Sequence, residues 1–113
     1  MMTAQEASAI DMMALAGAFR TLVADWDLDW RECRALLPSY REDMRPPTPD
    51  GERRMRMLVE IGHRLGFEDV EEKRDWLREP SPFWLWRTPL EVMGGTVADL
   101  RCFRDHVERG RGS

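Results

Sequence analysis

The chain has 113 residues, of which 42% are apolar and 34% are charged, so it forms one compact domain or two closely packed subdomains and is too short for a multidomain enzyme. Its 17 Lys and Arg residues against 21 Asp and Glu residues give a net charge of -4, which excludes a surface that is basic throughout. The two cysteines form no CxxC pair, and no apolar run reaches the length of a membrane span. We therefore expect a reduced, cytoplasmic protein that does not enter a membrane.

Apolar residues recur at helical spacing along the chain, without the alternation typical of strands. Thr3 and Glu6 form a capping-box pattern that predicts a first helix of about five turns. A second helix is predicted to begin at Asp29, with Glu32 three residues later, and to end before Pro38.

Proline and glycine divide the middle of the chain. A short third helix is predicted to begin at Ser39 and to be closed by the prolines at 46–49. The central helix runs from Asp50 to Gly66, which we expect to form a left-handed cap. A further helix is predicted to begin at Asp69.

The last part of the chain begins with an aromatic loop at residues 80–87. Residues 88–91 combine an N-cap threonine, a proline and a glutamate, which is the strongest helix start in the sequence. The glycines at 94–95 end this helix within about two turns, and Thr96 is predicted to begin the final helix.

These elements predict an all-α fold, a compact bundle of about six to seven short helices. Residues 1–50 would form a helix-turn-helix-like region packed on a second helical region, residues 51–113. A chain this small must bury aromatic residues across both regions, and Trp26 and Trp30 are the expected bridging residues. The first region carries five basic and nine acidic residues, whereas the second carries twelve of each.

The residues that carry chemistry give little support to catalysis. His63 and His106 lack the neighbours of a nucleophile or a metal site. Cys102 and His106 are four residues apart and share a helix face, so they are either two ligands of a metal site or a buried thiol beside a partly exposed imidazole. The acidic run at 68–72 lacks the spacing of a calcium loop. We expect no catalytic residue, no metal and no cofactor.

Residues 29–45 have the spacing of a helix-turn-helix, which would place four residues on a DNA duplex. These candidate DNA-binding residues are Ser39, Tyr40, Arg41 and Arg45. The acidic balance of residues 1–50 counts against tight non-specific binding, because phosphate contacts supply most of that affinity.

Residues 76–90 hold three tryptophans, one phenylalanine and three prolines. They fit either core packing or a protein-binding surface, because exposed Trp and Arg residues are typical anchors of interfaces. On the second interpretation Trp84, Trp86 and Arg87 are the expected anchors.

This part of the chain resembles the C-terminal toxin-binding domain of the Xre/MbcA/ParS antitoxin family, whose partners are RES-domain toxins. The resemblance covers residues 54–110 and rests on Trp76-Leu77, Pro80-Ser81-Pro82, Arg87-Thr88-Pro89-Leu90-Glu91-Val92-Met93 and the glycine turn Gly94-Gly95. The chain carries Trp84-Leu85-Trp86 where the family has a leucine-glycine-glycine-like stretch.

The resemblance implies a non-catalytic antitoxin that binds and occludes an NAD-degrading RES-domain toxin, as a homo-oligomer or in a hetero-oligomer with the toxin. Repression of its own operon through operator DNA would be a further role, and a stand-alone DNA-binding transcriptional regulator is the alternative. The residues expected to contact the toxin are Trp76, Pro82, Phe83, Trp84, Trp86, Arg87, Pro89, Leu90, Arg104, Arg109 and Arg111. Of these, Arg109 and Arg111 would reach the anionic-substrate pocket of the toxin.

Overall fold

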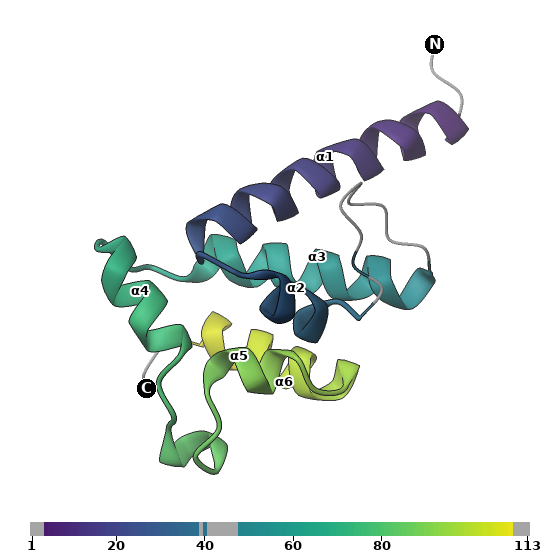
Figure 1. The fold of residues 1–113 in the computed structure, drawn as a ribbon. Helices are drawn as coiled ribbons and strands as arrows, with labels where there is room; N and C mark the ends of the chain where they lie inside the picture. Colours follow the sequence, from purple (N-terminus) through teal and green to yellow (C-terminus); the bar gives the residue numbers. More distant parts are fainter. Residues whose placement is uncertain (1–3, 39, 41–47, 110–113) are drawn as a thin grey trace.

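The computed structural model describes residues 4–38, 40 and 48–109, and within them it confirms the predicted all-α bundle (Figure 1). The elements are α1 (Ala4–Asp25), α2 (Trp30–Leu36), α3 (Pro49–Arg64), α4 (Val70–Leu77), a 3₁₀ turn (Pro82–Trp84), α5 (Pro89–Met93) and α6 (Val97–Glu108). The predicted helix start at Thr3 and the predicted third helix at Ser39 lie outside the described residues. None of the helices in the described part of the chain is long and apolar enough to cross a membrane.

The local start signals place three helices correctly. Asp29, Thr88 and Thr96 each accept a hydrogen bond from the backbone of the third helical residue, and the acidic side chain there accepts one from the cap, so all three capping boxes are formed. The predicted left-handed cap at Gly66 is wrong. The chain leaves α3 at Leu65 in an extended conformation (φ -73°, ψ 109°), which carries the next residues toward α4.

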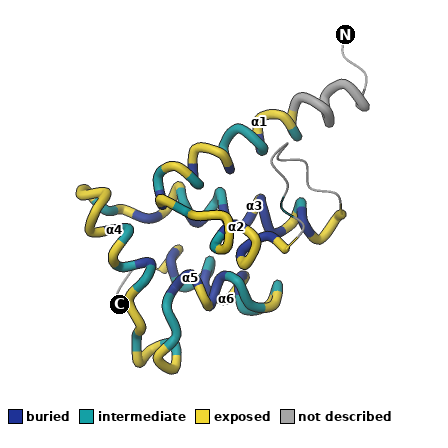
Figure 2. Tube along the Cα trace, viewed as in Figure 1, coloured by how far each residue is buried: buried dark blue, intermediate teal, exposed yellow. Residues whose placement is uncertain are grey.

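One hydrophobic core joins the two regions of the chain. Helix α3 packs on α1 on one side and on α6 on the other (Figure 1). The residues coloured as buried in Figure 2 lie along these helices, and the core includes Phe19 and Trp26 from the first region and Leu58 and Phe103 from the second. The expected sharing of aromatic residues between the regions is therefore confirmed for Trp26, which is fully buried.

Trp30 does not bridge the two regions. Half of its surface is exposed, and its ring lies beside two side chains of the first region, Tyr40 and Arg34. Its centroid lies 5.4 Å from that of Tyr40, and the guanidinium carbon of Arg34 lies 5.5 Å from its ring. It is the first residue of α2, whose buried residues are Cys33 and Leu36.

Two arginines, Arg74 of α4 and Arg78 at its C-terminal cap, form hydrogen bonds with the junction between α1 and α2. Arg74 donates hydrogen bonds to the last two carbonyls of α1, at 3.1 and 3.2 Å. Arg78 donates to both oxygens of the Glu32 carboxylate, each at 3.0 Å, and to the carbonyls of Trp26 and Asp27. Since the last turn of α1 has no basic residue, α4 supplies the positive charge that a helix C-terminus favours.

A buried arginine, Arg54, ties α3 to two other elements. Its side chain is only 7% exposed and donates to the carbonyls of Leu36, at the end of α2, and of Gly95, between α5 and α6. Each of these carbonyls lies at a helix end, where the backbone needs an outside donor. Arg54 thus satisfies backbone groups that the helices themselves leave open.

Candidate functional site

Residues 81–87, here called the aromatic loop, connect α4 to α5 and carry most of the predicted site. The backbone of Ser81 closes the loop: its N–H donates to the Arg87 carbonyl at 3.1 Å, and its carbonyl accepts from the N–H groups of Trp84 and Trp86 at 3.0 and 2.8 Å. The Ser81 hydroxyl also accepts from the N–H of Phe83 at 3.2 Å. These bonds fix the loop in one backbone conformation.

Two successive residues of the loop have left-handed backbone conformations. Leu85 has a φ of 58° and Trp86 a φ of 65°, and the only other non-glycine residue with positive φ in the described part of the chain is Asp27. Such conformations are strained for residues with a Cβ, and strained backbone is found most often at functional sites. The loop therefore stores strain at the two residues that point outward.

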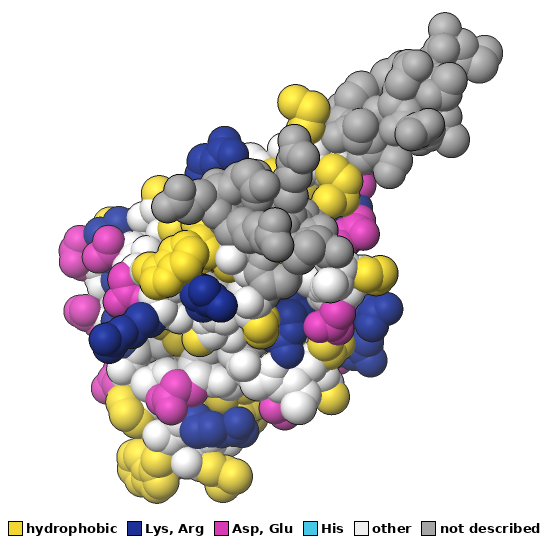
Figure 3. Space-filling model, turned by 45° about the vertical axis from the view of Figure 1, so that its right-hand side comes forward, with side chains coloured by type: hydrophobic (Ala, Val, Ile, Leu, Met, Phe, Trp, Pro, Cys, Tyr) yellow, Lys and Arg dark blue, Asp and Glu magenta, His cyan; other side chains and the backbone are white. Residues whose placement is uncertain are grey.

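The outward side of the loop is apolar. Leu85 is 80% exposed, Trp86 70% and Phe83 62%, and these three form what we call the apolar tip. Figure 3 shows hydrophobic side chains gathered at the lower end of the molecule, where the loop lies. An exposed apolar cluster on a small domain is typical of a protein-binding site.

Trp84 has a different role from its neighbours. Its ring is half-buried and lies 5.3 Å, centroid to centroid, from both Phe103 and His106 of α6. The tryptophan thus anchors the loop to the core, while Trp86 faces solvent. Of the three predicted anchors, the two tryptophans therefore differ: Trp84 packs against the core and Trp86 lies at the surface.

The other predicted residues of this region lie mostly beneath the loop. Pro89 and Leu90 are buried, so they support the loop and their side chains are not at the surface. Trp76 is half-buried against Phe103, and Arg87 is half-buried, with its Nε donating to the Trp84 carbonyl at 3.2 Å. Pro82 is exposed at the start of the 3₁₀ turn.

The predicted arginines of α6 are spread along the helix. Arg104 forms ion pairs with Glu60 of α3 at 3.5 Å and with Asp105 at 3.4 Å, which ties it to the body of the protein. Arg109 is exposed at the end of the helix, and Arg111 lies outside the described residues.

The predicted DNA-binding residues are described only in part. Ser39, Arg41 and Arg45 lie outside the described residues. Tyr40 is half-buried against the core, with its ring 6.3 Å from that of Phe19.

A cavity of about 390 Å³, here called the aromatic cleft, opens between the loop, the end of α4 and α6. Its lining includes Trp76, Glu79, Phe83, Trp84 and His106. The imidazole of His106 lies 4.7 Å from the ring of Phe83, and burial, together with the positive charge of Arg109, lowers its pKa. Glu79 and Leu85 were not among the predicted contact residues: Glu79 belongs to no recognisable motif, and Leu85 was noted only as part of the Trp84-Leu85-Trp86 stretch.

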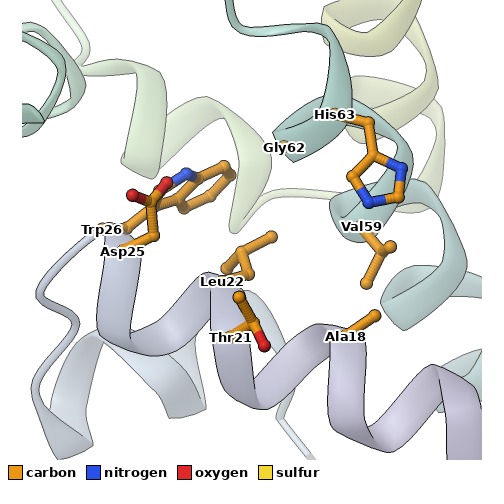
Figure 4. A pocket seen from close by; sticks show the side chains of 8 residues that line it. All are labelled: Ala18, Thr21, Leu22, Asp25, Trp26, Val59, Gly62 and His63. Atoms are coloured by element: carbon orange, nitrogen blue, oxygen red, sulfur yellow. The ribbon is translucent and has the colours of Figure 1, made fainter. Parts of the chain in front are cut away.

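A second cavity, of about 300 Å³, lies between α1 and α3 (Figure 4). His63 lies at one end of it, exposed, and Asp25 and Trp26 lie at the other, with Leu22 between them. The Asp25 carboxylate is bound by the amine of Lys73. The imidazole and the carboxylate therefore do not form an acid-base pair.

The sequence left two interpretations of Cys102 and His106, a pair of metal ligands or a buried thiol beside an imidazole, and the structure tests the second. Cys102 is exposed, so the interpretation as a buried thiol is wrong, because its side of α6 faces solvent. The buried cysteine is Cys33, whose pKa is raised by burial and by the charges of Asp29 and Glu32. Among the described residues no group of three or more His, Cys, Asp or Glu side chains could hold a metal ion.

No protein-family model, curated protein or solved structure matches the chain. The resemblance to antitoxins therefore rests on the sequence motifs alone.

Proposed function

We propose that this protein is an antitoxin that binds a RES-domain toxin through the aromatic loop and keeps that toxin inactive. The observation that carries the proposal is the apolar tip: Phe83, Leu85 and Trp86 are exposed on a loop whose backbone is hydrogen-bonded and strained. Large apolar side chains held rigidly at the surface lose little conformational entropy on binding, which favours a tight interface.

The sequence motifs support the same proposal. Of the residues that resemble the antitoxin family, Leu77, Pro89, Leu90, Val92 and Met93 are buried and lie beneath the loop, whereas Pro80, Pro82 and Glu91 are exposed. The chain departs from the family at Trp84-Leu85-Trp86, and two of these three residues, Leu85 and Trp86, belong to the exposed tip, while Trp84 is half-buried. A shared base with a variable tip is the arrangement expected when related proteins recognise different partners.

The experiment is co-expression of this chain with the product of its neighbouring gene, which the proposal predicts to be a RES-domain protein, followed by pull-down and an assay of cellular NAD. A stable complex that restores the NAD level supports the proposal, and no complex refutes it. Trp86→Ala should weaken the complex by about 2 kcal/mol, as expected for an interface anchor. Trp30→Ala is the matched control, because Trp30 is a half-exposed tryptophan on α2, away from the loop.

The C-terminal tail gives a second test of occlusion. Deletion of residues 110–113 should leave folding intact and weaken neutralisation if Arg111 reaches the anionic-substrate pocket of the toxin. Unchanged inhibition by the truncated chain would exclude the tail from the mechanism.

The alternative, a DNA-binding regulator, is favoured by one observation: Arg31 and Arg34 of α2 are both exposed. Basic side chains on a short surface helix can contact phosphates. A gel shift with the upstream operator at low salt tests this alternative, and Arg41→Glu should abolish any shift. If no shift is seen with the wild-type chain, the alternative is refuted for the protein without its partner.

A further inference from the structure

The aromatic cleft has the lining of a cation-binding site. Three rings, those of Trp76, Phe83 and Trp84, border it, and aromatic faces attract cations. Glu79 is the one acidic residue of the lining, and its carboxylate takes part in no ion pair or hydrogen bond with the described residues. Burial, together with the charge of Arg109, lowers the pKa of His106 and so favours the neutral imidazole, which repels a cation less than the charged form does.

Charges on α4 and the turn after it are sorted by face. The basic residues Lys73, Arg74 and Arg78 all contact the α1–α2 junction. The acidic residues Glu72, Asp75 and Glu79 recur at spacings of three and four, so they share the opposite face. Among the described residues, the basic residues form an ion pair with Glu71 but with none of Glu72, Asp75 and Glu79.

This acidic face borders a third cavity, of about 420 Å³, which we call the acidic furrow. Its lining consists of Phe67, Asp69, Glu71, Glu72, Asp75, Trp76 and Glu79. It shares Trp76 and Glu79 with the aromatic cleft, so the two cavities adjoin. Of its five carboxylates, only that of Glu71 forms an ion pair with a described residue, at 3.0 Å to Arg74.

We propose that the aromatic cleft binds an arginine side chain presented by the partner protein. The inference rests on the proposed function in that it supposes a protein partner. A guanidinium is planar and weakly hydrated, so it can stack on the rings of Trp76 and Trp84 while it donates two hydrogen bonds to Glu79. The acidic furrow attracts a basic segment on either side of that arginine, and this complementarity of charge selects a cationic occupant over an apolar one.

The cleft can be tested without the partner. The full chain is titrated with N-acetyl-arginine amide while the five indole N–H signals are followed by NMR. Saturable shifts are expected for Trp76 and Trp84, with much smaller shifts for Trp26 and Trp30, which do not line the cleft. N-acetyl-citrulline amide has nearly the same shape without the charge and should not saturate. Equal shifts with both compounds, or no saturable shift with arginine, would overturn the inference.

Two matched variants locate the binding charge. Glu79 is exposed, and Glu79→Gln should weaken arginine binding about fivefold, as expected for the loss of one surface ion pair. Glu72→Gln removes the same charge from the acidic furrow but not from the cleft, and should change the affinity less than about twofold. Equal effects of the two variants would show general attraction by the acidic face and would contradict a specific site.

The arginine that occupies the cleft could come from the partner or from the C-terminal tail of this chain. The chain without residues 110–113 distinguishes these two sources. If the deletion alone shifts the signals of Trp76 and Trp84 and strengthens arginine binding, Arg111 of this chain occupies the cleft and the inference is overturned. Unchanged signals support the inference.

Complex formation with the RES-domain protein separates this inference from the proposed function. If the wild-type chain does not bind that protein, the proposed function fails, while the arginine titration still decides whether the cleft binds a guanidinium. If the complex forms with equal affinity for wild type and Glu79→Gln, the cleft inference fails and the function stands. If Glu79→Gln weakens the complex about fivefold and Glu72→Gln does not, both are supported.

Discussion

The backbone at Leu85 provides a sharp test of the strain in the aromatic loop. Leu85 has a φ of 58° and a ψ of 42°, and its side chain is 80% exposed. A left-handed conformation costs a residue with a Cβ about 1–2 kcal/mol relative to glycine. Glycine in turn loses about 0.5–1 kcal/mol more backbone entropy on folding. Leu85→Gly should therefore be more stable than Leu85→Ala by about 0.5–1 kcal/mol.

The comparison with alanine isolates the backbone, because both variants remove the exposed part of the leucine side chain. Unfolding in urea, followed by circular dichroism, measures the two free energies. For a domain of this size a difference of 1 kcal/mol corresponds to a shift of about 4 °C in Tm. If Leu85→Gly is the less stable variant, the loop is not strained at this position and the reasoning fails.

The same variants test whether the strain serves binding. In the proposed antitoxin, both substitutions remove an apolar contact, but only glycine also loosens the loop. Leu85→Gly should therefore bind the toxin more weakly than Leu85→Ala although it folds more stably. Equal affinities of the two variants would show that the rigidity of the loop does not contribute to binding.

Three further predictions concern the supports of the loop and the core. Arg54→Ala should lower the free energy of unfolding by about 3 kcal/mol, because two backbone carbonyls lose a charged donor. Arg54→Lys should recover less than half of this loss. A loss below about 1 kcal/mol for Arg54→Ala in urea unfolding would contradict the role of Arg54. Trp84→Ala should destabilise the fold by about 2 kcal/mol, whereas Trp86→Ala should stay within about 0.5 kcal/mol of wild type and should lose affinity for the partner instead; equal destabilisation by the two would refute their separation. Because burial and the charge of Arg109 lower the pKa of His106 in the folded protein below its ordinary value of 6.5, the unfolded chain takes up this proton first on acidification. The contribution of His106 to stability is thus fully present above pH 6.5 and is lost as the pH falls through its folded pKa. His106→Gln should therefore reduce the loss of stability between pH 7 and 5, measured by unfolding curves. An unchanged pH profile of stability would contradict this prediction.

The helix starts could be predicted from the sequence because their signals are local. The capping boxes at Asp29, Thr88 and Thr96 each need a polar residue and an acidic residue three positions later, and such pairs can be read directly. The end of α3 could not be predicted in this way. Gly66 permits a left-handed cap but does not require one, and the chain takes an extended path instead.

The sequence singled out residues 76–90 as a candidate site, but it did not predict how the structure arranges their side chains. The aromatic residues of 76–90 and the two interpretations of them were visible in the sequence. The sequence did not show that Trp84 is half-buried while Trp86 is exposed. This difference depends on the left-handed backbone at Leu85, and apolar residues give no signal for positive φ. Contacts such as that between Arg78 and Glu32 join residues 46 positions apart, which no local pattern encodes.

The loop and the cleft belong to one surface because Phe83 takes part in both. Its side chain is 62% exposed at the apolar tip, yet its ring also borders the cleft beside Trp84 and His106. A partner that covers the tip would therefore also close the mouth of the cleft, which removes water from Glu79 and strengthens its attraction for a cation. On this reasoning the effects of Trp86→Ala and Glu79→Gln on the affinity for the toxin should not be additive, and the double variant measures their coupling. Additive losses would show that the tip and the cleft bind independently.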